Sequence, residues 1–279
     1  MIQLEVKKEK RVITVDRCVD LPVDNVEALI LDWKRARFII KKKFRVIAGS
    51  RRLGQLWLVL DPLIISMIYL FVFTVIRYQP DPRSLFIGIT YVRILQLGLR
   101  NGFNNSVDYT GGIIIERVRT RALLFSEYML IVTNTFFMCF GVCLLFLLFY
   151  DSSLLDVIII FLGALVMYLM WYGIGAFFSP LGTKIPDLKQ LVSYLGMMMF
   201  FASPALYSLG QTKGIHRTVS MYNPFSYIVE ITRNVVLDSN DLYLLNYNLG
   251  VFYMILFLTF ITFSIIRFDY NRWRYSTWN

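Results

Sequence analysis

Histidine and cysteine are nearly absent from this sequence of 279 residues, which holds one histidine and three cysteines. His216 has no cluster of metal-ligating residues around it. Cys139 and Cys143 lie one helical turn apart in an apolar stretch, which is not the spacing of a zinc site. The sequence therefore predicts no metal site and no disulfide framework.

The motifs of nucleotide-binding and hydrolytic sites are also missing. No GxxxxGK[ST] phosphate-binding loop occurs, and neither HExxH nor GxSxG is present. Asp108, Glu116 and Glu127 lie near one expected loop, but no histidine or serine accompanies them there. We therefore expect a chain that is not an enzyme and that holds no cofactor of its own.

Charged residues make up only 17% of the chain, whereas 57% of its residues are hydrophobic. This balance is too apolar for a soluble domain of this size, and the apolar residues come in long blocks typical of a membrane protein. The net charge is +10, and 14 of the 29 lysines and arginines precede Leu53. Such a block favours the anionic lipids of the inner leaflet, and no nucleic acid partner is expected.

The N-terminal part divides into a polar arm and an amphipathic helix. Residues 1–23 are predicted to form a cytoplasmic arm, either a short hairpin or a loose tail, with no apolar core of a cleavable signal peptide. Residues 24–52 are predicted to form a helix, because Asp24 and Glu27 resemble a capping box and apolar residues then recur at helical spacing among lysines and arginines. Such a helix suits the inner membrane surface.

The remainder, residues 53–279, is predicted to be the transmembrane domain. A spanning helix needs roughly 20 apolar residues. Six stretches meet or nearly meet that length, namely residues 55–76, 85–106, 128–149, 155–178, 189–209 and 247–267. The short link at 151–156 leaves room only for a tight helical hairpin. The predicted fold class is thus an all-α integral membrane protein with six transmembrane helices and an N-terminal amphipathic interface helix.

The distribution of lysine and arginine predicts the orientation. With the N-terminus inside, the inner segments hold 22 lysines and arginines and the outer segments hold 5. This bias predicts a multi-pass protein of the cytoplasmic membrane with both termini in the cytoplasm. The connection 210–246 would then lie outside, where Asn223-Pro224 can begin a helix, and one or two short helices there are expected to re-enter the outer leaflet. Ile228, Ile231 and Val235 would mark the apolar face of that helix.

Two arginines fall within the second apolar stretch. Arg93 and Arg100 are seven residues apart and lie on nearly one face of a helix. An intramembrane arginine must face protein or water, so both are expected to line a polar interior or to pair with acids. Arginine binds phosphates and carboxylates through parallel hydrogen bonds, which makes contact with acidic groups of a substrate one interpretation. Snorkelling toward headgroups or a structural ion pair is the other.

Aromatic residues are frequent in the fourth and fifth stretches. Such rings stack on sugar faces, and they also fill bundle cores and interfacial belts. With the two arginines, the candidates for a substrate channel are Tyr168, Trp171, Tyr172, Tyr194, Phe200 and Phe201.

Three passages resemble the ABC-2 type permease subunits of polysaccharide exporters, which serve capsule, O-antigen and teichoic acid systems. Residues 53–62, LGQLWLVLDP, resemble the family's entry to its first span. Residues 185–191, followed by Ser203-Pro204 and Tyr207, resemble its loop and fifth span. Residues 223–233 carry its NPxxxxVExxR signature. The resemblance extends from about Asp24 to the end of the chain.

The resemblance implies a homodimer of six-span subunits that works with two copies of a separate ABC ATPase, which binds ATP and Mg²⁺. The implied substrate is a glycan on a lipid carrier, moved among membrane lipids. The surface helix and the loop after the second span would dock on the ATPase, with a coupling helix near 116–124. The implied coupling residues are Trp33, Arg37, Glu116, Arg117, Arg119 and Arg121. The implied outer gate contains Asn223, Pro224, Glu230 and Arg233.

Two alternatives share parts of this pattern. An ABC-2 permease that exports lipids or small molecules would have the same fold and nearly the same sequence features. A secondary transporter would need no ATPase and would carry ionisable groups within the membrane, which are few in this sequence.

Overall fold

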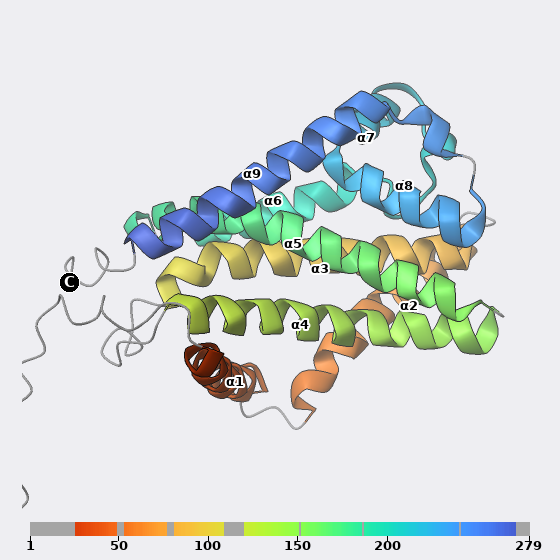
Figure 1. The fold of residues 1–279 in the computed structure, drawn as a ribbon. Helices are drawn as coiled ribbons and strands as arrows, with labels where there is room; N and C mark the ends of the chain where they lie inside the picture. The colour runs from red at the N-terminus through yellow and green to blue at the C-terminus, as the bar shows by residue number, and fades with distance from the viewer. Residues whose placement is uncertain are drawn as a thin grey trace, which may run out of the picture.

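Helices make up nearly all of the chain that the structure describes. The computed structural model describes residues 26–48, 53–76, 81–108, 120–150, 152–185, 187–239 and 241–271. Within these ranges there are nine α-helices, three short 3-10 helices and no strand (Figure 1). The prediction of an all-α protein is confirmed for this part of the chain, while the predicted arm at residues 1–23 lies outside it.

Two long helices form the centre of the bundle. Helices α3 (Pro82–Asp108) and α5 (Leu154–Lys184) pack against each other along much of their length, with α4 (Thr120–Phe149) beside them (Figure 1). Glycines allow this close approach. A Cβ atom at Gly102 of α3 would lie 2.2 Å from the Tyr172 carbonyl oxygen, and one at Gly175 of α5 would lie 2.3 Å from the Leu99 carbonyl oxygen. Small residues at such positions let helix backbones meet directly.

The remaining helices surround this centre. Helix α2 (Trp57–Ile76), preceded by η2 (Gly54–Leu56), packs on α3 and α4, and α6 (Leu188–Phe201) packs on α3. Helix α9 (Tyr247–Asn271) packs on α5. Between α6 and α9 lie η3 (Leu209–Gln211), α7 (Gly214–Tyr222), α8 (Pro224–Leu237) and η4 (Asp241–Leu244). Helix α1 (Val26–Ala48) crosses the beginning of α4 at the other end of the bundle (Figure 1).

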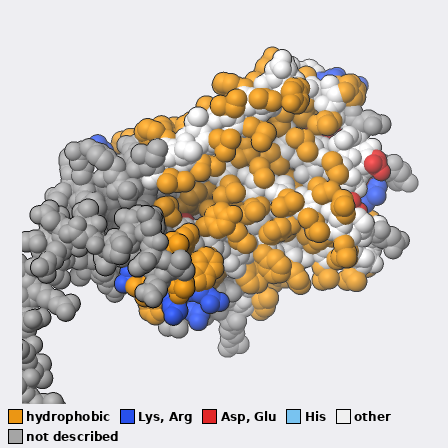
Figure 2. All heavy atoms as spheres, viewed as in Figure 1, with side chains coloured by type: hydrophobic (Ala, Val, Ile, Leu, Met, Phe, Trp, Pro, Cys, Tyr) orange, Lys and Arg blue, Asp and Glu red, His pale blue; other side chains and the backbone are white. Residues whose placement is uncertain are grey.

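An apolar exterior indicates a membrane protein. By length and composition, the segments 122–149, 154–182 and 247–265 could each cross a membrane, and 57–73 and 188–201 are apolar but shorter. Figure 2 shows hydrophobic side chains over most of one face, with lysines and arginines gathered near α1. Exposed apolar side chains on α9 include Phe252, Met254, Ile255 and Leu258. So large an apolar surface is typical of contact with lipid or with a partner protein.

The predicted fifth span, residues 189–209, is not one continuous helix. Helix α6 ends at Phe201, and a turn follows it. The cause is Ser203-Pro204, because proline lacks a backbone donor and disfavours helical geometry in the residue before it. Helix α4 differs in the opposite sense, since it begins at Thr120, eight residues before the predicted start at 128.

The structure contains a helix within the predicted range 24–52 and the predicted hairpin. Helix α1 covers Val26–Ala48, and its buried side consists of Asp32, Ala36, Ile39 and Ile40. The hairpin between α4 and α5 ends at a capping box in which the Ser153 hydroxyl accepts a hydrogen bond from the Asp156 backbone N–H at 3.2 Å. The Asp156 carboxylate in turn accepts one from the Ser153 N–H at 2.8 Å.

Candidate functional site

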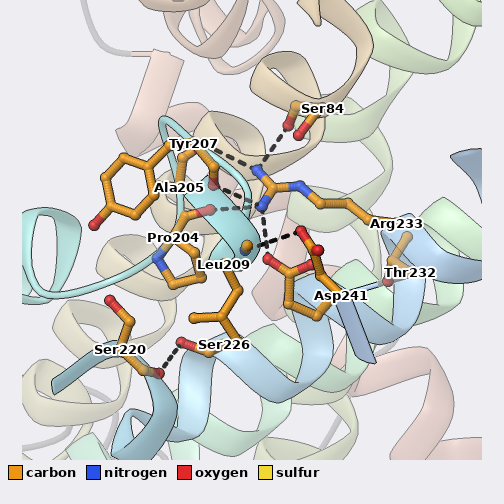
Figure 3. A network of polar contacts seen from close by, with 12 residues as sticks. Ser84, Pro204, Ala205, Tyr207, Leu209, Ser220, Ser226, Thr232, Arg233 and Asp241 are labelled. Carbon is orange, nitrogen blue, oxygen red and sulfur yellow. Dashed lines mark hydrogen bonds and ion pairs between the residues drawn. The ribbon is translucent and has the colours of Figure 1, made fainter. Parts of the chain in front are cut away.

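Arg233 of α8 lies at the centre of a buried polar network (Figure 3). Helix α8 is at the end of the bundle opposite α1 (Figure 1). The Arg233 side chain is only 1% exposed. The guanidinium donates hydrogen bonds to the Glu230 carboxylate at 3.0 Å and to four backbone carbonyl oxygens, those of Pro204 (2.6 Å), Tyr207 (3.1 Å), Ser84 (2.9 Å) and Ala205 (3.2 Å). One side chain thus joins α8, the start of α3 and the turn after α6.

The turn after α6 explains what Arg233 does there. The break at Ser203-Pro204 leaves carbonyl oxygens without the N–H donors that a continuing helix would supply. A buried carbonyl group without a donor is costly, and three of the acceptors of Arg233 belong to this turn. Arg233 therefore supplies hydrogen bonds to the carbonyl oxygens that the helix break in the fifth apolar stretch leaves without donors.

Glu230 is the counter-ion of this arginine. Its side chain is fully buried and lies one helical turn before Arg233. Burial raises the pKa of the Glu230 carboxyl and lowers the pKa of the Arg233 guanidinium, while the attraction between the two groups opposes both shifts. The pair leaves neither charge facing open surface, while the hydrogen bonds of Arg233 to carbonyl oxygens outside α8 attach this helix to the rest of the fold.

Asn223 and Pro224 start α8 as predicted. The Asn223 side-chain oxygen accepts a hydrogen bond from the Phe225 N–H at 3.0 Å, and Pro224 occupies the first helical turn. The Asn223 amide nitrogen also donates to the Ala202 carbonyl oxygen at 3.0 Å. Two of the passages that carry the resemblance, residues 203–207 and 223–233, are therefore joined in one network. Of the predicted apolar face of α8, Ile231 and Val235 are about half exposed, whereas Ile228 is partly buried and packs against the core.

The third passage leads to a separate ion pair. The Arg93 Nε atom lies 3.3 Å from Oδ2 of Asp61, and its Nη2 donates to Oδ1 at 3.4 Å. Arg93 also donates to the Gln96 side chain, which in turn donates to the Gly196 carbonyl oxygen of α6 at 3.2 Å. Of the two interpretations of Arg93, the structure favours the ion pair. The ion pair joins α2 to α3, and the hydrogen bonds through Gln96 extend this connection to α6. Arg100 is exposed.

The aromatic channel candidates fall into two groups. Tyr168, Trp171 and Phe200 are buried inside the subunit, and Tyr172 is half-buried. The Tyr168 hydroxyl accepts hydrogen bonds from Asn101 at 2.7 Å and from Asn134 at 3.3 Å, so it is part of the bundle core. Tyr194 and Phe201 of α6 are exposed.

The coupling candidates are described only in part. Trp33 is 46% exposed and packs edge-on against Phe125 of α4 with ring centroids 5.9 Å apart. Arg37 is exposed on α1. Glu116, Arg117 and Arg119 lie outside the described residues, as does the side chain of Arg121.

Two contacts were not anticipated from the sequence. Tyr91 of α3 donates a hydrogen bond to the Ile160 carbonyl oxygen at 2.8 Å, and its hydroxyl lies 3.1 Å from the Thr232 hydroxyl. Glu127 accepts hydrogen bonds from Lys43 of α1 and from Tyr172 of α5.

The spacing Gly98-x-x-x-Gly102 in the sequence is a signal for close helix packing at α3, and this signal was missed in the predictions from the sequence.

Across the described ranges, no group of three or more histidine, cysteine, aspartate or glutamate side chains could hold a metal ion. The polar side chains of the network in Figure 3 face backbone groups and one another. The arrangement therefore defines a polytopic helical membrane protein whose polar residues hold its helices together.

Comparison with known proteins shows which class of membrane protein this chain is similar to. No family model matches the chain. The chain is 26% identical over 242 residues to an O-antigen export system permease protein RfbA of Klebsiella pneumoniae, covering 85% of this chain and 91% of that protein. A second RfbA protein of Klebsiella pneumoniae is 26% identical over 235 residues, covering 82% and 87% of the two chains. The polysialic acid transport protein KpsM of Escherichia coli is 22% identical over 223 residues, covering 76% and 81%.

These comparisons confirm the predicted resemblance. The chain is similar, over most of its length, to ABC-2 type permeases of polysaccharide export.

Proposed function

We propose that this chain is the permease subunit of an ATP-driven exporter that moves a lipid-linked polysaccharide across the cytoplasmic membrane. The observation that carries the proposal is the similarity to O-antigen export permeases over 85% of this chain and 91% of the relative. The lack of a phosphate-binding loop in the sequence fits a division of labour in which a separate subunit binds ATP and Mg²⁺.

In this proposal the six spans are α2, α3, α4, α5, α6 and α9, and both termini lie in the cytoplasm. Helix α6 has 14 residues and reaches roughly 21 Å, so the turn after it completes the crossing. Non-helical backbone within a membrane requires partners from the protein, and Arg233 supplies them. Helices α7 and α8 re-enter the outer leaflet, and the residues from Asn223 to Arg233 hold the outer gate in place.

The working unit in this proposal is a homodimer with two ATPase subunits. Closure of the ATPase pair on ATP pulls α1, whose exposed Trp33 and Arg37 contact it together with Glu116, Arg117, Arg119 and Arg121. The two permeases then rock and open a path for the glycan between them. Exposed Tyr194 and Phe201 line that path and stack on sugars, while buried Tyr168, Trp171 and Phe200 support its wall.

Co-purification tests the central claim. The full chain, carrying an affinity tag, is isolated in mild detergent from its native membranes. We expect an ABC ATPase subunit in equal amount, and ATP hydrolysis by that complex should rise when the lipid-linked glycan is added. Isolation of the chain without any ATPase would contradict the proposed function. Stimulation by a lipid without glycan, to the same degree, would favour the lipid exporter instead.

Arg100 provides a test of substrate contact. Its guanidinium is exposed and can bind a phosphate or an acidic sugar. We expect Arg100→Ala to reduce glycan-stimulated ATP hydrolysis by about tenfold, because one charge-assisted contact contributes roughly 1.5–3 kcal/mol. The matched control is Arg83→Ala, which removes a half-exposed arginine near the start of α3. Equal stimulation in Arg100→Ala and in the wild type would exclude this contact.

A further inference from the structure

A single buried carboxylate joins three helices at the α1 end of the bundle. Glu127 of α4 is only 5% exposed. The Lys43 ammonium of α1 donates a hydrogen bond to its Oε1 atom. The Tyr172 hydroxyl of α5 donates to its Oε2 atom at 3.3 Å. The two oxygens of one side chain thus contact α1 and α5.

These bonds add a directional contact to the packing of α1 on the bundle. The other contacts of α1 with the bundle include buried Ala36, Ile39 and Ile40 and the ring contact of Trp33 with Phe125. Apolar contacts of this kind are non-directional, so they tolerate sliding of one helix along another. A charge-assisted hydrogen bond to a buried carboxylate has a fixed geometry and is costly to break. Glu127 therefore fixes the position of α1 along α4.

The connection continues into the centre of the bundle. Tyr172 lies one turn from Tyr168, with their rings stacked at a centroid distance of 6.4 Å. The Tyr168 hydroxyl accepts a hydrogen bond from Asn101 of α3. The backbone of α5 at Tyr172 meets α3 directly at Gly102. The same residue of α5, Tyr172, thus contacts α3 at Gly102 and the Glu127 carboxylate that binds Lys43 of α1.

We infer that Glu127 is a positioning residue that transmits the movement of α1 to α5, and so couples ATP hydrolysis to glycan export. This inference rests on the proposed function, in which the ATPase pulls on α1. Glu127 contacts neither ATP nor glycan in this role; it acts through Lys43 and Tyr172.

The test compares transport with hydrolysis in the whole complex. Permease and ATPase are reconstituted into liposomes, and the lipid-linked glycan moved per ATP hydrolysed is measured. We expect Glu127→Gln to lower this ratio about tenfold, within the usual range of coupling energies, while ATP hydrolysis stays within about twofold of the wild type. Tyr172→Phe keeps the ring and removes one hydrogen bond, so a loss of about threefold is expected. The matched control is Thr133→Val, which removes a hydroxyl that bonds only within α4 in this structure, to the Met129 carbonyl oxygen.

A second readout separates coupling from general stability. Spin labels replace exposed Lys41 of α1 and exposed Lys184 of α5. The distance between them should stay constant between nucleotide states in the wild type and change in Glu127→Gln. The exchanged variant Lys43→Glu with Glu127→Lys should regain much of the lost transport ratio.

The outcomes are distinct. If Glu127→Gln and Tyr172→Phe both export as much glycan per ATP as the wild type, the inference is overturned and the proposed function stands. If Glu127→Gln does not assemble, Tyr172→Phe alone decides. A wild-type chain that carries no ATPase contradicts the proposed function, and the inference is overturned with it.

Discussion

Replacing Arg233 with methionine is expected to lower the free energy of unfolding by about 3–5 kcal/mol, because it leaves a buried charge without its partner. Methionine keeps most of the side-chain volume and removes every donor. Glu230 would then be a buried carboxylate without its counter-ion, and carbonyl oxygens of the turn after α6 would lose their donor. The fold-stabilising role of the pair thus predicts a large effect from one substitution.

The measurement is unfolding of the purified chain in mild detergent by titration with a denaturing detergent, followed by tryptophan fluorescence. Arg83→Met is the matched control, since Arg83 pairs with Asp81 while both side chains are about 40% exposed. Pairs of that kind contribute at most about 1 kcal/mol. The double variant Glu230→Gln with Arg233→Met should recover part of the loss, because it removes the buried charge. An unfolding midpoint for Arg233→Met equal to that of the wild type would show that the pair does not stabilise the fold.

The turn that Arg233 supports shows why the sequence predicted most helices but not their ends. Hydropathy identifies a stretch by its average, and residues 202–209 are nearly as apolar as the helix before them. The break at Ser203-Pro204 is a backbone effect, which an average of side-chain hydropathy does not detect. Asn223-Pro224 could be interpreted correctly because a cap and a proline act within a few residues of the helix they start.

Partners distant in the sequence were the main unknown at the site. The sequence showed that Arg93 had to meet protein or water, but Asp61 lies 32 positions earlier on another helix. Which acid it meets depends on how α2 and α3 align, and no local pattern specifies that alignment. Glu230 and Arg233 are different, because a spacing of three residues places both on one side of a helix.

The aromatic candidates on α5 illustrate a second limit. Helix α5 is apolar on all sides, so the periodicity of its sequence does not distinguish a lipid-facing or channel-facing side from a core-facing side. Tyr168 and Trp171 turn inward because Asn101, Asn134 and Phe257 meet them there.

The position of Glu127 was predicted wrongly for a different reason. Because α4 begins earlier than predicted, Glu127 lies two turns inside this helix rather than at the end of a loop.

Replacing Gly102 with alanine is expected to lower the free energy of unfolding by about 2 kcal/mol, since overpacking a well-packed core typically costs about 1–3 kcal/mol. The added Cβ would lie 2.2 Å from the Tyr172 carbonyl oxygen and 2.9 Å from the Ala176 nitrogen. Both are backbone atoms, so only a separation of α3 from α5 can relieve the contact. Alanine favours a helix over glycine by up to about 1 kcal/mol, which offsets part of the loss.

Gly196→Ala is the matched control for this position, because it is also a buried glycine within a helix. Its added Cβ would lie 3.2 Å from Cγ of Gln96, a side-chain atom that needs to shift by only a few tenths of an ångström. The same detergent titration should therefore place Gly196→Ala within about 1 kcal/mol of the wild type, the size of the gain in helix propensity. If the proposed coupling through α5 holds, Gly102→Ala should also reduce the glycan exported per ATP. A Gly102→Ala variant as stable as Gly196→Ala would mean that α3 and α5 are not in direct backbone contact.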